Sequence, residues 1–148
     1  MRACLVCLLL VAVMLSSGCA IVHDYKSASG IKEANTINII ENPETRAGFL
    51  AAMKSWLDSH GYKYNVLPRD GDRAHGWVLT YDGRWSWDWT IFLAKATINA
   101  YKDGVEEGYA TYSVDGETVN QNLSKWRSAE GTIKKMMSNV FNQMKDTN

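Results

Sequence analysis

Apolar side chains recur at regular spacing along most of the chain after residue 35. Thr36–Glu41 places Ile37 and Ile39 on one side, which predicts a strand. The segment 43–59 has large apolar residues at helical spacing, namely Phe49, Leu50, Met53, Trp56 and Leu57. Asn42 and Pro43 are typical of a helix start, and His60 with Gly61 of a helix end. We therefore predict a helix over 43–59, then a strand over 62–67 and a break at 68–72.

Two hairpins are predicted for the middle of the chain. Asp82–Gly83 is a strong two-residue turn signal, and such a turn would place Thr80 opposite Trp85 and Val78 opposite Trp87. The next two strands have apolar faces, made by Phe92, Ala94, Ala96, Ile98 and Ala100 and by Gly108, Ala110, Tyr112 and Val114. A three-residue loop over 102–104 puts both sets on one face, so we predict that loop.

Three tryptophans in this region are out of phase with the apolar residues that follow them. Trp85, Trp87 and Trp89 occupy odd positions, whereas the next apolar set occupies even ones. One interpretation is a β-bulge near 89–91, which would bring the indoles into the core. The other is a regular strand that leaves the three indoles on the open face of the sheet. Both interpretations remain open from the sequence.

A last helix is predicted after a polar stretch that follows Asp115–Gly116. Ser124 can cap it, and its apolar stripe comprises Trp126, Ala129, Ile133, Met136, Met137, Val140, Phe141 and Met144. Methionines on this helix complement the small residues expected on the sheet. The predicted fold class is α+β, a two-layer structure whose antiparallel-rich sheet of four to five strands has two helices on one face, in the order β-α-β-β-β-β-α.

The composition fits one domain of modest size. The 148 residues are 46% apolar and 11% aromatic, which excludes a collagen-like, coiled-coil or wholly disordered chain. All three cysteines lie at or before position 19, so the rest of the chain must fold without a disulfide. The position of the cysteines therefore indicates a role in processing of the N-terminus and not in stabilising the fold.

The first 18 residues have the layout of a secretory signal. Arg2 supplies a positive start, and Ala3–Leu15 is an apolar run of 13 residues, shorter than the roughly 20 needed to span a bilayer. The stretch from Leu15 to Cys19, with the sequence LSSGC, resembles the lipobox of bacterial lipoproteins. This resemblance implies cleavage before Cys19 and acylation of its sulfur. Large aliphatic residues usually occupy the place that Ser16 holds here.

The expected domain organisation follows from that cleavage. Residues 1–18 form the lipoprotein signal peptide, 19–35 the lipidated cysteine with a flexible tether, and 36–148 a single globular periplasmic domain. Ala20 directly after the cysteine resembles the signal for sorting to the outer membrane rather than for retention at the inner one. Cleavage removes one of the 16 basic residues and none of the 16 acidic ones, and this near-neutral balance argues against nucleic acid as a partner.

No motif for catalysis, metal binding or a cofactor is recognised. The three histidines, His23, His60 and His75, have no carboxylate or second histidine at ligand spacing. The segment 70–72, with the sequence DGD, lacks the other oxygen ligands of a calcium loop and is expected to be a plain turn. We therefore expect a protein that is not an enzyme and that has no cofactor and no metal.

The aromatic cluster is the one candidate binding surface. Trp85, Trp87 and Trp89 on an exposed face would form an indole row able to stack on sugar rings or to contact an apolar patch, and Tyr101 and Tyr109 could extend it. The alternative is that the tryptophans belong to the core.

The segments RWSWDWTIFLAKATINAYKDGVEEGYATY (84–112) and SKWRSAEGTIKKMMSNVF (124–141) resemble an uncharacterised family of small Gram-negative bacterial lipoproteins known by a locus-tag name. That family supplies no catalytic residues. We expect a non-catalytic outer-membrane lipoprotein whose domain binds an envelope protein and which contacts the membrane through the lipid on Cys19. The alternatives are a glycan- or lipid-binding module that uses the tryptophan row, and a periplasmic immunity-type protein.

Overall fold

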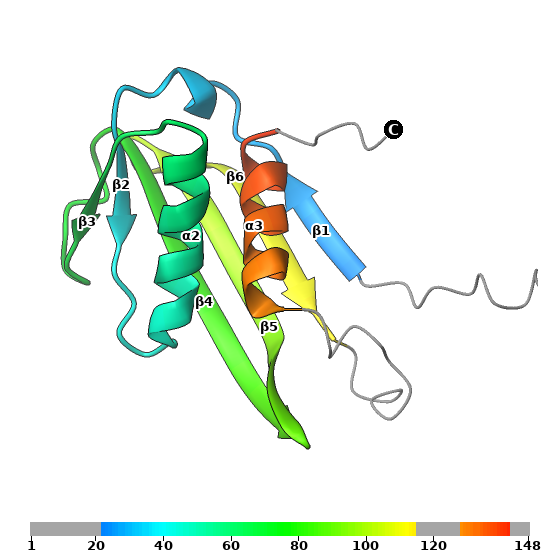
Figure 1. Cartoon of the computed structure of the whole chain (residues 1–148). Coiled ribbons are helices and arrows are strands. Elements are labelled where there is room, and N and C mark those ends of the chain that lie inside the picture. The colour runs from blue at the N-terminus through cyan, green and yellow to red at the C-terminus, as the bar shows by residue number, and fades with distance from the viewer. Residues whose placement is uncertain (1–21, 115–127, 143–148) are drawn as a thin grey trace, which may run out of the picture.

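The computed structural model describes residues 22–114 and 128–142, which form a mixed six-stranded sheet with two helices on one face (Figure 1). The elements in chain order are β1 (Val22–Lys26), the 3-10 turn η1 (Ile31–Glu33), β2 (Ile37–Ile40), α2 (Ala47–Ser59), β3 (Tyr64–Leu67), β4 (Trp77–Asp88), β5 (Thr90–Lys102), β6 (Val105–Ser113) and α3 (Ala129–Val140). The strand order is β1-β6-β5-β4-β2-β3. The predicted α+β class and two-layer arrangement are confirmed, with one strand more than the upper limit of the prediction.

The first predicted strand, helix and following strand form a βαβ unit. β2 pairs in parallel with β3 on one side and with β4 on the other, while the remaining neighbours are antiparallel. α2 begins at Ala47, four residues later than predicted, because the Asn42 side chain accepts a hydrogen bond from the Glu44 amide and stabilises a turn there. The helix ends at the predicted place, where Gly61 has φ 74°.

The segment predicted as a flexible tether is part of the fold from Val22 onward. β1 pairs with β6 along its whole length, and Ile31 is completely buried. The Ser27 hydroxyl donates to the carbonyl of Asn139 at 2.8 Å. Residues 22–35, predicted as part of the tether, therefore belong to the folded unit. The sequence did not reveal β1 because this edge strand exposes Asp24, Tyr25 and Lys26, so it has no continuous apolar face.

The predicted turn at Asp82–Gly83 is wrong, because both residues lie inside the long strand β4. Gly83 allows α2 to approach the sheet: a Cβ there would lie 2.7 Å from the ring of Phe49. Thr80 is opposite Asn99 and Val78 is opposite Tyr101, in place of Trp85 and Trp87. The chain reverses at Trp89 instead.

The loop between β5 and β6 also differs from the prediction. Asp103 and Gly104 form a two-residue turn with φ values of 50° and 82°, as a tight hairpin requires. An irregularity in the pairing at Ala100/Tyr101 then shifts the register, so that Ile98 is opposite Ala110. Ala96, Ile98 and Ala100 therefore share one face with Ala110 and Tyr112, as predicted. The predicted three-residue loop is wrong, and so is the placement of Phe92 on that face, because Leu93 takes its place there.

The core lies between the sheet and the two helices. Met136 and Met137 of α3 are fully buried, and the sheet offers small buried residues such as Ala96 and Ala110, which agrees with the predicted pairing of methionines with small residues. Ser128 caps α3 through a hydrogen bond from the Gly131 amide. The predicted positions Ser124, Trp126 and Met144 lie outside the described residues.

Candidate functional site

The hairpin of β4 and β5 extends beyond the helix layer at one end of the molecule (Figure 1). Three large apolar side chains are exposed at its end: Trp87 is 72% exposed, Trp89 90% and Ile91 47%. Trp87 and Ile91 are direct cross-strand partners, and Trp89 forms the reversal between the strands. We call these three residues the aromatic tip.

A β-bulge in β5 determines which face the tip presents. Arg84 pairs with Lys95 and Trp85 pairs with Leu93, so Ala94 is an extra residue on β5. The extra residue shifts the phase of β5 and puts Leu93, a core residue, beside Trp85 on the helix side of the sheet. The bulge therefore lies at Ala94, outside the predicted range of 89–91.

The three tryptophans occupy different environments. Trp85 is half-buried against the core, and the Arg46 guanidinium lies 5.3 Å from its ring centroid. Trp87 and Trp89 are exposed. Neither interpretation of the sequence describes this arrangement. Trp85 lies under the helix layer and packs on the core, whereas Trp87 and Trp89 lie beyond that layer and are exposed.

Trp89 holds an unfavourable backbone conformation. Its φ of 58° lies in the left-handed region, which glycine and asparagine adopt far more readily than a bulky side chain. Residues held in such conformations often occur at functional sites. The turn therefore holds a tryptophan in a backbone conformation that this residue type disfavours.

The two tyrosines of the predicted surface lie elsewhere. Tyr101 and Tyr109 are half-buried, and they alternate along their strands with the core residues Ala100 and Ala110, so they point to the face without helices. Tyr109 is opposite Asn99, which is eight residues, or about 26 Å, from Ile91 along β5. The predicted continuous surface of indoles and tyrosines is therefore two separate surfaces.

Tyr109 is linked to the edge strand on this uncovered face. Its hydroxyl donates to a carboxylate oxygen of Asp24 at 3.2 Å, and this hydrogen bond raises the pKa of Tyr109. Thr111 donates to the Asp24 carbonyl at 3.1 Å. Around these residues the face is polar, and the half-buried side chains of Thr97 and Asn99 lie on the adjacent strand.

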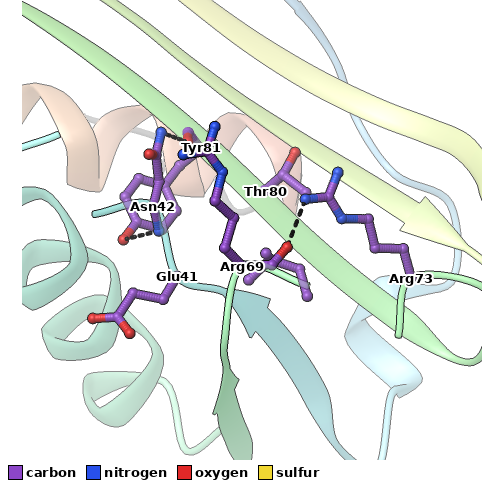
Figure 2. A pocket seen from close by; sticks show the side chains of 7 residues that line it. Glu41, Asn42, Arg69, Arg73, Thr80 and Tyr81 are labelled. Atoms are coloured by element: carbon purple, nitrogen blue, oxygen red, sulfur yellow. Dashed lines mark hydrogen bonds between the residues drawn. The ribbon is translucent and has the colours of Figure 1, made fainter. Parts of the chain in front are cut away.

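A pocket of about 180 Å³ lies where β2 ends beside β4 (Figure 2). Its lining residues are Ile40, Glu41, Asn42, Arg69, Arg73, Thr80 and Tyr81. The Asn42 amide donates to the Tyr81 hydroxyl at 3.1 Å, and burial raises the pKa of that tyrosine. These residues come from three separate segments of the chain, and no motif in the sequence indicated that they meet.

The two arginines of the pocket bind to the protein itself. Arg69 pairs with Glu44, and Arg73 donates to the carbonyl oxygen of Arg69 at 3.1 Å. Figure 2 shows both side chains beside Thr80 on the same side of β4. The pocket combines cationic and amide groups with one carboxylate, a set that can bind a small polar group.

The histidines do not form a catalytic or metal-binding cluster within the described ranges. The His60 ring stacks on Trp56 with centroids 4.0 Å apart, at the end of α2. His75 Nδ1 lies 2.6 Å from Oδ2 of Asp72, and Oδ1 of the same carboxylate accepts the Ala74 amide. Among residues 22–114 and 128–142, no group of three or more His, Cys, Asp or Glu side chains is placed to hold a metal ion.

The solved structures include a chain that is similar to this one. No family model matches the chain, and no curated protein matches it. A 2.35 Å crystal structure described as a minor lipoprotein from Acinetobacter baumannii is similar over 76% of this chain and 93% of its own, with 16% identity and a TM-score of 0.37. None of the helices in the described part of the chain has the length and hydropathy needed to cross a membrane.

Proposed function

We propose that this chain is a non-catalytic lipoprotein of the outer membrane, acylated at Cys19, whose periplasmic domain binds another protein of the envelope. The signal-like segment 1–18 and the Gly18–Cys19 junction support the lipid anchor. Cys19 is three residues from Val22, the first residue of β1. The domain is thus held directly at the membrane surface, where it meets other envelope proteins.

The observation that carries the protein-binding proposal is the sheet face without helices. Both helices pack on the opposite face (Figure 1). β1, β6 and β5 therefore present a largely polar surface that includes Tyr101 and Tyr109, whereas Val78 of β4 on the same face is completely buried. Tyrosine is enriched at protein interfaces because its ring offers apolar area at low entropic cost and its hydroxyl forms hydrogen bonds. Thr97 and Asn99 add donors and acceptors beside it.

Photocrosslinking in cells tests this surface. A photoreactive phenylalanine in place of Tyr101 should give an adduct with an envelope protein, because its ring lies on the proposed contact face. The matched control carries the same residue at Ser55, which is exposed on α2 in the helix layer. Adducts that are absent at Tyr101, or equally strong at Ser55, contradict the proposed face.

The anchor has a separate test. Cys19→Ser should abolish labelling of the protein with radioactive palmitate, because no sulfur is left at the predicted acylation site. Cys7→Ser, inside the segment expected to be removed, is the matched control and should leave labelling unchanged. Labelling that persists in the Cys19→Ser variant contradicts the proposed anchor.

A further inference from the structure

The sheet register relates the N-terminus of the fold to the aromatic tip. Val22, the first residue of β1, is opposite Ser113 at the end of β6. Ser113 is opposite Lys95, and Lys95 is opposite Arg84 on β4. From Arg84 the hairpin continues for five residues to Trp89, which corresponds to about 17 Å. The tip therefore projects past the level at which β1 begins, and in the direction from which the chain enters β1.

The position of the proposed lipid follows from chain length. Three residue steps separate Cys19 from Val22, so the cysteine lies within about 10 Å of the start of β1. Acylated Cys19 is located at the headgroup level of the bilayer, since its fatty acids are in the hydrocarbon layer. The membrane surface therefore lies close to the end of the sheet from which the tip projects.

The tip has the chemistry of a membrane-interface anchor. Tryptophan is enriched at the headgroup level of bilayers because the indole is amphipathic, and Ile91 adds apolar surface next to Trp87. The three side chains lie together at one end of a hairpin, where they can enter the interface without any rearrangement of the core. Neither helix covers them (Figure 1).

Positive charge lies directly behind the tip. Arg84 and Lys95 are exposed and directly opposite each other, a like-charge pair that is unfavourable unless an anion neutralises it. Arg46 is exposed at the start of α2, next to Trp85. Among the side chains that the structure describes, a set that leaves out Asp88, these three cations have no ion-pair partner. Anionic lipid headgroups would attract these cations toward the membrane surface.

We propose that the aromatic tip inserts into the interfacial region of the bilayer that holds the acylated Cys19. The domain then contacts the membrane at two places, the lipid on Cys19 and the aromatic tip. This proposal rests on the lipid anchor proposed above. It assigns Trp87, Trp89 and Ile91 to lipid contact, and Arg84 and Lys95 to electrostatic attraction by anionic headgroups. A domain fixed in this way has a defined orientation, and its uncovered sheet face is available to a protein.

Depth-dependent fluorescence quenching tests the proposal on the full mature lipoprotein. The chain has no cysteine after Cys19, so Thr90→Cys and Glu106→Cys each add one free thiol for an environment-sensitive dye. Thr90 is next to the tip, whereas Glu106 is exposed beside the turn at the other end of the hairpin β5–β6. Each protein is reconstituted into vesicles of phosphatidylethanolamine and phosphatidylglycerol that contain spin-labelled lipid.

The dye at position 90 should shift its emission to the blue and lose intensity to the spin label, and the dye at position 106 should do neither. Trp87→Ser combined with Trp89→Asn should abolish the response at position 90, while Val105→Ser, which removes a residue 62% exposed at the other end, should not change it. Far-UV circular dichroism and thermal unfolding of each variant show that the fold is retained.

Two results would overturn the proposal. One is an unquenched dye at position 90 in a protein that mass spectrometry shows to be acylated, which leaves the anchor intact. The other is a protein adduct formed in cells from a photoreactive residue at Trp89 together with no quenching in vesicles, which assigns the tip to a protein. Absence of the acyl mass overturns the anchor instead, and quenching at position 90 on added vesicles then still reports on the tip.

Discussion

The amide of Ala28 donates a hydrogen bond to the carbonyl of Val140 at 2.8 Å, which ties the segment after β1 to the last residue of α3. The two residues are separated by most of the folded chain. Because β1 also pairs with β6, the N-terminal segment is held by both the sheet and the helix layer. The proposed lipid is therefore attached to the folded domain through three residues and not through a long tether.

Gly108→Ala should destabilise the protein by about 2 kcal/mol, a typical cost of overpacking. A Cβ at this position would lie 2.6 Å from the backbone nitrogen of Ala28 and 2.7 Å from the carbonyl oxygen of Lys26. Both atoms are backbone atoms held by neighbouring structure, so the segment after β1 would have to move away from the sheet. Urea denaturation followed by circular dichroism measures the change.

Gly48→Ala is the matched control for that substitution. Gly48 lies in the first turn of α2, and nothing lies within 4 Å of its added Cβ. Alanine is the better helix former, so we expect a gain of up to about 1 kcal/mol. Equal effects of the two substitutions would contradict the close packing of the Ala28 segment on Gly108.

Amphipathic elements with a fully formed apolar face were predictable from the sequence. The strand at Ile37, the helix around Trp56 and the stripe of α3 all bury residues at the expected spacing. β1 was not predictable, since its partner strand and the contact with α3 supply the stability that its own sequence pattern does not show. Tertiary contacts, and not the local sequence pattern, therefore determine that residues 22–26 form a strand.

The Asp82–Gly83 signal failed for a different reason. A glycine is favourable in a tight turn and also where a helix must approach a strand closely, and the sequence pattern does not distinguish the two uses. Gly83 has the second use, because it allows Phe49 of α2 to lie close to β4. The true reversal at Trp89 contains neither glycine nor asparagine, so no turn signal indicated that the tip would be exposed.

Trp89→Asn should stabilise the isolated protein by about 1 kcal/mol. Asparagine tolerates the left-handed φ of 58° better than tryptophan does, and the exposed indole contributes little buried area to the fold. Thermal unfolding of the variant in detergent-free buffer, with Cys19 replaced by serine in both proteins, measures the gain. Trp87→Asn serves as the control, because residue 87 lies within β4 and has no positive φ to relieve. An equal gain at both positions would refute the role of backbone strain.

Trp56 and Ser138 should be energetically coupled by about 1 kcal/mol. The indole nitrogen of Trp56 donates to the Ser138 hydroxyl at 3.0 Å, and this bond joins α2 to α3 inside a cluster with Phe141 and Tyr62. A double-mutant cycle with Trp56→Phe and Ser138→Ala isolates the coupling in urea denaturation. Strict additivity of the two substitutions would show that the bond contributes nothing to stability.

The exposed pair of His75 and Asp72 should titrate in opposite directions. The hydrogen bond and the charge of Asp72 raise the pKa of His75 above 6.5, whereas the Ala74 amide and then His75 lower the pKa of Asp72 below 3.8. Stability from the histidine is therefore fully present below its unfolded pKa of 6.5 and is lost as the pH rises through its folded pKa. Stability from the aspartate is present above 3.8 and is lost as the pH falls through its lowered pKa.

Nuclear magnetic resonance of the histidine rings measures this effect directly. Asp72→Asn should lower the pKa of His75 toward its ordinary value, because the substitution removes the negative charge while the asparagine oxygen can still accept the Ala74 amide. Asp70→Asn, which changes a nearby carboxylate outside the pair, is the control and should leave the His75 titration unchanged. A His75 pKa that does not respond to Asp72→Asn would show that the 2.6 Å contact does not form in solution.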